Sequence, residues 1–482
     1  MGVLVCARRM VPVRVVRQLR VLGPATRRAR DARHAAARAN GQTHDPTPAL
    51  YDSDPHHERR LRRGGAGERL SSVTDRRDRW VSDTCMQCAY HVCVPGPVSI
   101  SGERSRESGM AIRDRSARTP RRGRAGSAAS APARPPVTGT ATGPWLLRGK
   151  DGRLTAYVPC EGGLLRWTES RPGGPDWSEP AFFPVDDLTH LTVAQGADAY
   201  VHFLGRRERR ADGAVLVDVV HAVQYQTGRP LTEWRSLGNP HSAPDKAALL
   251  GAPAAAVTPS GDVHVFARNA GGGLMMRREG RGGRWEPWAD LRGAGLRDGV
   301  TATAAAGRVE VFAPAGGVTL TWSQPEPGAV PRRFPDVRPG ALPGSAAALE
   351  TASGRLTWFW TDPAGTGLVC LRPGSWAVPL SGTPADGANV LLRQVLDGYD
   401  CTVIAHRGRA GTVLVGVCGT EAEASGLWWG DTGRACLGDP ALAHDAQGRV
   451  VLAVVGPDGE LWVTRQGDGP GLTFTDWLRM PS

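Results

Sequence analysis

The sequence predicts an all-β fold: a seven-bladed β-propeller of four-stranded blades over residues 141–482, preceded by a disordered, Arg-rich segment over residues 1–140. Three observations predict this organisation. A unit of roughly 45 residues that reads as four short strands recurs along the chain. One strand in most units is built from small side chains, and the composition changes sharply near residue 140.

The stretch 250–291 is the clearest copy of the unit. It reads as a small-residue run, an alternating run, a third strand and a Trp-bearing end (residues 252–257, 263–268, 274–278 and 285–288). Strict alternation of apolar and other residues is typical of a β-strand. Turn-forming residues separate the strands at 259–261 and 269–272. The unit is therefore expected to fold as one antiparallel sheet.

A glycine stands shortly before the alternating strand in all seven copies. These glycines are Gly152, Gly196, Gly261, Gly307, Gly354, Gly398 and Gly448. The apolar phase begins two residues later in five copies. In the second and sixth copies it begins three residues later, at Ala199 and Cys401, which keeps the same face buried. Seven copies in register predict seven blades.

The strand before each glycine is expected to be innermost, because small side chains suit the axis where sheets converge; examples are 301–307 and 345–351. Large aromatic residues mark the outer ends and are expected to fill the wider gaps between sheets. They are Trp177, Trp234, Trp285, Trp288, Phe334, Trp376, Trp428, Trp429 and Trp477. Neither end of the array has a polar capping repeat, so a closed ring is favoured over an open solenoid. The last copy contains four strands of its own, so the ring is expected to close without an exchanged strand.

The segment 1–140 differs from the rest in charge. It holds 27 Arg, no Lys and 12 acidic residues, whereas 14 of the 15 Trp lie between Trp145 and Trp477. Such a composition buries too little apolar surface to offset the entropy of ordering. The segment has three possible interpretations: a solvated tail, sequence translated upstream of a true start at Met110, or a basic arm that binds nucleic acid or another polyanion. Nucleic-acid binding is not favoured, since 57 Arg against two Lys suggest a high-GC bacterial genome.

Cys85, Cys88, His91 and Cys93 form the one metal-like pattern in this segment. Zinc takes four such ligands, but all four lie within nine residues without a second knuckle, so chance is the favoured interpretation. The sequence contains no run of 18 apolar residues, so no membrane span is predicted. Arg interrupts the N-terminus too often for a signal peptide. A cytoplasmic location is expected, with export by a non-classical route left open.

The repeats resemble the PLL-like seven-bladed propeller lectins, and more distantly the tectonin-type repeats, over about residues 145–482. The resemblance is carried by G-[RD]-[VL]-x-V-F at 261–266 and 307–312, by Gly-Glu-Leu-Trp at 459–462, and by Trp-x-x-Trp at 285–288. It implies a carbohydrate-binding protein for fucose-type glycans, with sites between neighbouring blades. Such sites combine an aromatic ring with charged groups.

The ligand-binding candidates are Trp462 with Arg465, Arg278 at the corresponding position after Leu274 and Met275, and the tryptophans Trp285 and Trp288. Packing between blades is the alternative role for these tryptophans. The Trp of the third strand is replaced in most blades, by Leu165, Met275, Thr319 or Val369, so most sites of this type are expected to be lost.

Non-catalytic recognition is the expected function, with a glycan or glycoconjugate as partner, a protein partner as the alternative and a propeller glycoside hydrolase as the least favoured reading. Candidate carboxylates such as Asp262, Glu310 and Asp445 are scattered, and the Asp-box motif of sialidases is absent. No cofactor is expected. No metal site is expected either, since His264, His406 and His444 fall in different blades.

Cys401 and Cys418 are predicted to lie directly opposite each other, in a hairpin that turns around Arg409 and Ala410. Whether they are bonded is left open, because a cross-strand pair lies near the limit of disulfide reach.

Overall fold

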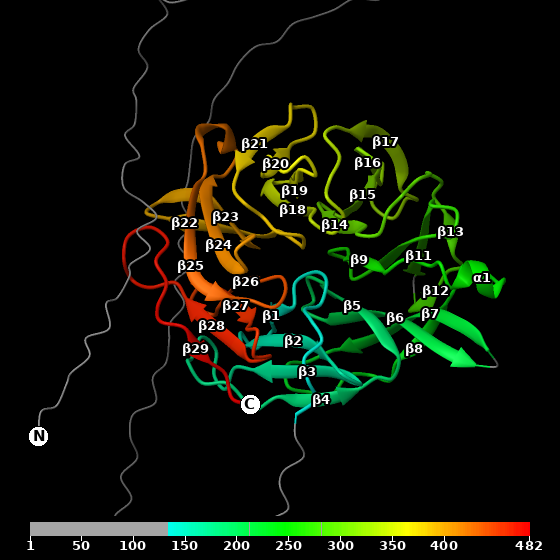
Figure 1. Ribbon diagram of the computed structural model, residues 1–482, viewed down its shortest axis with the longest axis horizontal. Coiled ribbons are helices and arrows are strands. Elements are labelled where there is room, and N and C mark those ends of the chain that lie inside the picture. Colours follow the sequence, from blue (N-terminus) through cyan, green and yellow to red (C-terminus); the bar gives the residue numbers. More distant parts are fainter. Residues whose placement is uncertain (1–133, 212, 281) are drawn as a thin grey trace, which may run out of the picture. The chain divides into compact units, whose positions relative to one another are not determined.

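The computed structural model describes residues 134–482, apart from residues 212 and 281. Seven antiparallel sheets follow one another along the chain and stand around a common axis (Figure 1). The predicted seven-bladed β-propeller is confirmed. Met110 and the Cys85, Cys88, His91 and Cys93 pattern lie outside the described residues.

Each blade is a four-stranded meander in chain order. The first four blades are β1 (Leu146–Arg148), β2 (Leu154–Cys160), β3 (Gly163–Thr168) and β4 (Ala181–Pro184); β5 (Leu188–Gln195), β6 (Val201–Ala211), β7 (Ala214–Gln224) and β8 (Arg235–Gly238); β9 (Ala254–Val257), β10 (Val263–Arg268), β11 (Leu274–Gly280) and an outer strand split into β12 (Arg284–Trp285) and β13 (Ala289–Asp290); and β14 (Thr301–Ala305), β15 (Arg308–Ala315), β16 (Val318–Ser323) and β17 (Arg332–Val337).

The last three blades are β18 (Ala347–Ala352), β19 (Arg355–Thr361), β20 (Leu368–Leu371) and β21 (Val378–Ser381); β22 (Val390–Leu396), β23 (Tyr399–Arg407), β24 (Thr412–Gly419) and β25 (Trp428–Ala435); and β26 (Ala441–His444), β27 (Val450–Val455), β28 (Leu461–Arg465) and β29 (Leu478–Arg479). The described helices are short: α1 (Pro244–Ala247) and the 3-10 turn η1 (Glu423–Ser425). We call the end that carries the turn between second and third strands the upper face (residues 456–460 in blade 7), and the opposite end the lower face.

The second strand of each blade begins within two residues of the position that the glycine pattern predicts. Six of the seven glycines adopt positive φ, a conformation that glycine takes without steric cost. In blade 2, Ala199 takes it instead of Gly196, at φ 60°. Ala199 therefore lies in the turn, and β6 begins at Val201 rather than at Ala199 as predicted.

The alternation of the second strands does not produce one buried and one exposed face. In β10, the side chains of Val263 and Val265 project to one face of the sheet and that of His264 to the other, yet His264 is also buried, with 1% of it exposed. A neighbouring blade covers each face of the sheet, so both sets of side chains are buried. Sequence alternation therefore locates these strands, and the neighbouring blades account for the burial of both of their faces.

The outer aromatic residues divide into two groups. Trp177 is buried, and Trp234, Trp285, Trp288, Trp429 and Trp477 are half-buried against core clusters. Phe334, Trp376 and Trp428 are instead 52%, 91% and 47% exposed. The prediction that aromatic residues at these positions fill the gaps between sheets is wrong for these three, because they lie at strand or turn positions that no neighbouring blade covers.

The ring closes between blade 7 and blade 1, each of which contains four strands of its own, as predicted. The segment 134–142 fastens this closure. Val137 bridges to Cys160 of blade 1, and Thr142 bridges in parallel to Thr192 of blade 2. Arg134 forms an ion pair with Glu460 of blade 7 at 3.2 Å. We call residues 134–142 the strap.

Cys401 and Cys418 are not opposite each other, contrary to prediction. Cys401 pairs with Gly419, and Cys418 pairs with Thr402. The hairpin is centred on Ala410, since Arg407 pairs with Val413, so the register differs by one residue from the predicted one. One residue reverses the face to which a side chain projects. Both cysteines are free thiols.

Candidate functional site

Tryptophan side chains link neighbouring blades by one recurring contact. In four of the junctions between blades, an indole N–H donates a hydrogen bond to a backbone carbonyl near the end of the preceding blade's outer strand. The pairs are Trp288 to Leu237 (3.2 Å), Trp322 to Leu291 (2.9 Å), Trp429 to Leu380 (3.3 Å) and Trp167 to Pro481 (2.8 Å). These bonds satisfy a polar group that burial would otherwise leave without a partner.

The candidates Trp285, Trp288 and Arg278 lie at two different junctions. Trp285 packs edge-on against His221 of blade 2, with ring centres 5.2 Å apart, and Trp288 binds Leu237 of the same blade. Arg278 instead reaches blade 4: its guanidinium donates to Glu286 at 2.7 Å and to the Gly328 carbonyl at 2.6 Å. The structure thus brings the two tryptophans together at one junction and places the arginine at the next.

Arg465 is also separated from its predicted partner. It is 6% exposed and lies between blades 7 and 1, where it pairs with Glu169 at 2.5 Å and with Asp445 at 3.7 Å. Trp462 lies three residues earlier on β28, and an odd separation directs two side chains to opposite faces of a strand. Arg465 therefore fastens the closure of the ring, whereas Trp462 faces blade 6.

Trp462 has a different arginine beside it. The guanidinium carbon of Arg434, near the end of β25, lies 3.3 Å from the centre of the Trp462 ring. The indole N–H of Trp462 and the Nε–H of Arg434 are both buried and have no hydrogen-bond acceptor. Trp462 is thus an inter-blade tryptophan without the carbonyl contact seen in the four junctions above.

Arg407 adds a further donor to the same junction. It ends β23 and pairs with Val413, whose side chain packs in the cluster shared by blades 6 and 7. Directly paired residues of antiparallel strands project to the same face, so Arg407 also faces blade 7. Its Nε–H is buried without an acceptor. We call Arg407, Arg434 and Trp462 the donor cluster; all three lie at the upper end of their strands.

The electrostatics of the donor cluster are unbalanced. Within the described part of the chain, neither Arg407 nor Arg434 has an ion-pair partner. Burial lowers the pKa of Arg434, and the exposed Asp458 only opposes this shift. Burial likewise raises the pKa of Asp439, which Arg407 opposes. An unsatisfied buried donor costs about 1–3 kcal/mol, so a cluster of them calls for an explanation such as a ligand.

The sequence carries only a weak signal for this cluster. Trp462 was identified by its motif, but Arg407 and Arg434 belong to the preceding repeat and to no motif. A rule that pairs the third-strand Trp of one repeat with basic residues at the upper strand ends of the repeat before it would have found them.

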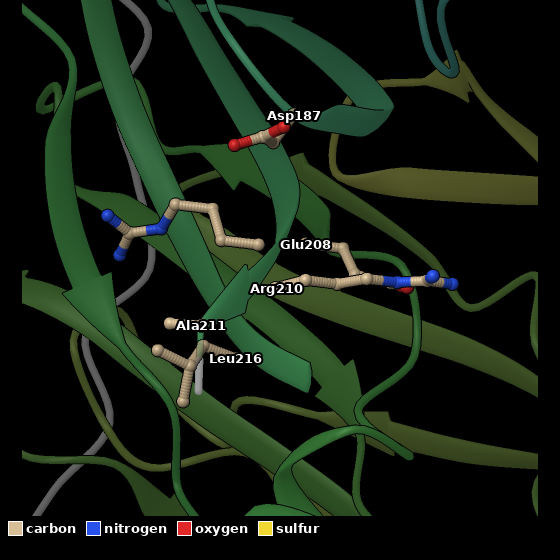
Figure 2. Close-up of a pocket in the computed structure, with 6 residues that line it drawn as sticks. Asp187, Glu208, Arg210, Ala211 and Leu216 are labelled. Carbon is tan, nitrogen blue, oxygen red and sulfur yellow. The ribbon is translucent and has the colours of Figure 1, made fainter. Parts of the chain in front are cut away.

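A surface hollow lies elsewhere, at the tip of the long β6–β7 hairpin. It has a volume of about 560 Å³ and is lined by Asp187, Glu208, Arg209, Arg210, Ala211 and Leu216. Figure 2 shows Arg210 and Leu216 extending away from Asp187 rather than converging with it on one point. The hollow has charges of both signs and no aromatic residue in its lining, so it is a weaker site for a ring-shaped ligand.

A second space lies between blades 1 and 2, next to Tyr157 and Gln224, and measures about 10 Å³. This is close to the volume that one water molecule needs. Residues 134–482, without 212 and 281, contain no group of three His, Cys, Asp or Glu side chains placed to hold a metal ion. None of the helices in this part of the chain is long and apolar enough to cross a membrane.

Comparison with solved structures finds similar folds. The BP39L lectin from Burkholderia pseudomallei matches with a TM-score of 0.53 and 14% identity, over 71% of this chain and 99% of that chain. A polysaccharide lyase of family PL25, an ulvan lyase, matches with a TM-score of 0.44 and 11% identity, over 70% and 96% of the two chains. The Aleuria aurantia lectin, in complex with Fucalpha1-6GlcNAc, matches with a TM-score of 0.39 and 11% identity, over 62% and 98%. Neither a protein-family model nor a curated protein sequence matches this chain. The similarity to the BP39L lectin is a similarity of fold.

Proposed function

We propose that this protein is a non-catalytic carbohydrate-recognition propeller that binds a glycan at the upper end of the junction between blades 6 and 7. One observation carries the proposal: the buried N–H donors of Arg434 and Trp462, whose groups are stacked on each other, have no acceptor, and neither does the Nε–H of Arg407 on the same face of blade 6. A sugar presents apolar C–H faces that pack on an aromatic ring and oxygen atoms that accept from such donors.

The resemblance to PLL-like lectins supports the same class of ligand and extends it to fucose-type glycans. The similarity of fold to the BP39L lectin is consistent with it. On this proposal the junctions of Trp167, Trp288, Trp322 and Trp429 carry packing, because their indole N–H groups already donate to Pro481, Leu237, Leu291 and Leu380.

Recognition without catalysis is proposed because the acidic residues are committed or dispersed. The buried carboxylates Glu169, Asp445 and Glu423 form ion pairs with Arg465, Arg449 and Arg372. Burial raises the pKa of Glu279, Glu310 and Asp439, as a general acid would require. Glu279 and Glu310 belong to blades 3 and 4, and Asp439 to the link between blades 6 and 7. A glycosidase needs two carboxyl groups on either side of one bond.

A glycan array tests the proposal, with the full chain, Trp462→Ala and Trp477→Ala. Trp477 is the matched control: it is half-buried on the same blade and packs against the same core cluster, but it belongs to the lower end. We expect selective glycan binding that Trp462→Ala reduces at least tenfold and Trp477→Ala leaves within twofold, with both variants folded. Absence of binding to any glycan, or equal loss in the two variants, would contradict the proposal.

A protein-binding scaffold is the alternative, and one observation favours it. Turns between first and second strands and between third and fourth strands meet at the lower face, where Tyr225, Trp376, Val395 and Tyr399 are exposed. Exposed large apolar groups on one face are typical of interaction surfaces. Under this alternative, Trp376→Arg abolishes capture of a protein partner while glycan binding is unchanged.

A further inference from the structure

We infer that the glycan bound between blades 6 and 7 carries a negative charge, as the carboxylate or sulfate of an acidic sugar, with Arg407 and Arg434 as the residues that select it. The inference rests on the proposed function and specifies its ligand. It does not follow from the lectin resemblance, which implies fucose-type glycans.

The first argument is the hydrogen-bonding character of the donor cluster. Guanidinium and indole groups donate and never accept. A sugar hydroxyl both donates and accepts, so a neutral sugar would leave its own hydroxyl hydrogens without partners against these groups. Carboxylate and sulfate oxygens only accept, and their hydrogen bonds to a guanidinium are charge-assisted. The three unsatisfied donors of Arg407, Arg434 and Trp462 therefore match an anion better than a hydroxyl.

The second argument is a comparison with blade 4, where an arginine stacks on a tryptophan of the same blade and both groups have acceptors. There the guanidinium of Arg333 lies 4.8 Å from the ring centre of Trp322. Arg333 has an acidic partner, Asp336, at 2.5 Å, and the Trp322 indole N–H donates to the Leu291 carbonyl. At the junction of blades 6 and 7 the arginine lacks the carboxylate and the indole lacks the carbonyl. An anionic ligand would supply both.

The third argument concerns the acidic residues near the cluster. Asp458 is exposed in the turn between β27 and β28, where its carboxylate accepts from the backbone of Glu460 at 3.1 Å. The side chain of Glu460 is already paired with Arg134 and Arg479. Burial raises the pKa of Asp439 and the charge of Arg407 opposes this rise, but the two side chains form no ion pair in the described part of the chain. The positive charge of the two arginines is therefore available to a ligand.

Binding measurements with a matched pair of sugars test the inference. The probes are a uronate-terminated oligosaccharide, the same oligosaccharide with its carboxyl group reduced to an alcohol, a sulfated oligosaccharide, a fucoside and inorganic sulfate. We expect the uronate or the sulfated sugar to bind at least about tenfold more tightly than the reduced neutral sugar, which corresponds to one charge-assisted hydrogen bond. The affinity is expected to fall as the salt concentration rises from about 0.05 to about 0.5 M, because salt screens the attraction between opposite charges.

Substitutions place the effect. Arg434→Gln and Arg407→Gln keep N–H donors but remove the charge, and each is expected to weaken binding of the acidic sugar about tenfold or more while affecting the neutral sugar less. Arg333→Gln is the matched control, because it removes an arginine from a tryptophan ring whose site has its own acceptors. It is expected to leave binding unchanged. If a glutamine variant does not fold, Arg434→Lys takes its place in the comparison. Lysine keeps the charge but lacks the planar guanidinium, so this variant tests the geometry of the hydrogen bonds to the acidic sugar.

The outcomes separate the two proposals. Equal binding of the acidic and reduced sugars, or binding of the fucoside alone, overturns the inference and leaves carbohydrate recognition standing. Acidic binding that neither arginine variant weakens overturns the assignment to Arg407 and Arg434. Binding of inorganic sulfate as tight as that of any sugar shows an anion site without sugar selectivity and overturns the inference. Failure of all probes to bind contradicts both proposals.

Discussion

Arg434 and Trp462 join blade 6 to blade 7 by a stacked contact in which the guanidinium carbon lies 3.3 Å from the centre of the indole ring. At four other junctions an indole N–H donates to a backbone carbonyl of the preceding blade, as Trp322 does with Leu291. The same type of side chain therefore serves as a fastener at one junction and is left with an unused donor at another. This difference gives a stability test that needs no ligand.

Trp322→Phe and Trp462→Phe are predicted to differ in cost. Trp322→Phe removes a buried hydrogen bond and leaves the Leu291 carbonyl without its donor, whereas Trp462→Phe removes a donor that had no acceptor. We expect Trp322→Phe to lower the free energy of unfolding by about 1–3 kcal/mol more than Trp462→Phe. Urea denaturation of both variants measures the difference. Equal losses would mean that the Trp462 indole N–H has a partner in solution.

Arg465 is predicted to be essential for closing the ring. Arg465→Met leaves Glu169 buried without its positive partner, and breaking a buried pair by removing one member costs about 3–5 kcal/mol. We expect the double variant Arg465→Met/Glu169→Leu to be more stable than Arg465→Met alone, since it removes the uncompensated charge. Thermal or urea unfolding of the two single variants and the double variant provides the cycle. Additive losses would exclude coupling between the two side chains.

Acid is predicted to destabilise the junction between blades 2 and 3. Burial lowers the pKa of His202 to about 4 and that of His221 to about 3, from 6.5, and the two rings share a hydrogen bond of 3.1 Å. Because the folded state binds these protons less readily than the unfolded state, stability is fully present above pH 6.5 and is lost as the pH falls toward 4 and 3. The loss for His202 is of order 3 kcal/mol.

Melting temperatures measured from roughly pH 7.5 to roughly pH 4 check this prediction, because the range includes the reference pKa of histidine, about 6.5. His221→Phe, which keeps a ring against Trp285, is expected to flatten the profile below pH 6.5. A wild-type profile without a decline in this range would contradict the assignment of His202 and His221 as buried neutral groups.

The strap is predicted to stabilise the propeller. Removing residues 134–142 breaks the backbone hydrogen bonds of Thr138 to Pro159 and of Thr142 to Leu191, and the ion pair of Arg134 with Glu460. A chain that begins at residue 143 is expected to lose about 1–3 kcal/mol of unfolding free energy relative to one that begins at Met110, since each such bond contributes about 0.5–1.5 kcal/mol before the entropy of ordering is counted. Equal unfolding midpoints would show that closure depends on blades 1 and 7 alone.

The sequence was sufficient to predict the blades because their determinants are local. A turn glycine before the second strand repeats seven times, and only the second copy departs from it, where Ala199 adopts positive φ in place of Gly196. The position of Cys418 was misjudged for a related reason. Register depends on the length of the turn, and the actual hairpin is closed by Arg407 and Val413 around an odd number of residues.

The donor cluster could be predicted only in part because its members come from different blades. Trp462 stands in a recognisable motif, but Arg434 lies inside an irregular stretch of β25, between Asp431, which pairs with Leu414, and Ala435, which pairs with Thr412. Such an irregularity interrupts the alternation from which the facing side of a residue is inferred. Arg465, the arginine nearest to Trp462 in sequence, projects to the opposite face and pairs with Glu169.

The indole N–H resonances of the tryptophans give the most direct test of glycan recognition between blades 6 and 7. Titrating the protein, labelled with ¹⁵N-tryptophan, with the glycan selected on the array reports on each indole separately. We expect the Trp462 resonance, assigned by Trp462→Phe, to shift with saturation while those of Trp477 and Trp322 stay in place. A titration in which the Trp462 resonance does not move while the glycan binds would contradict the proposed site.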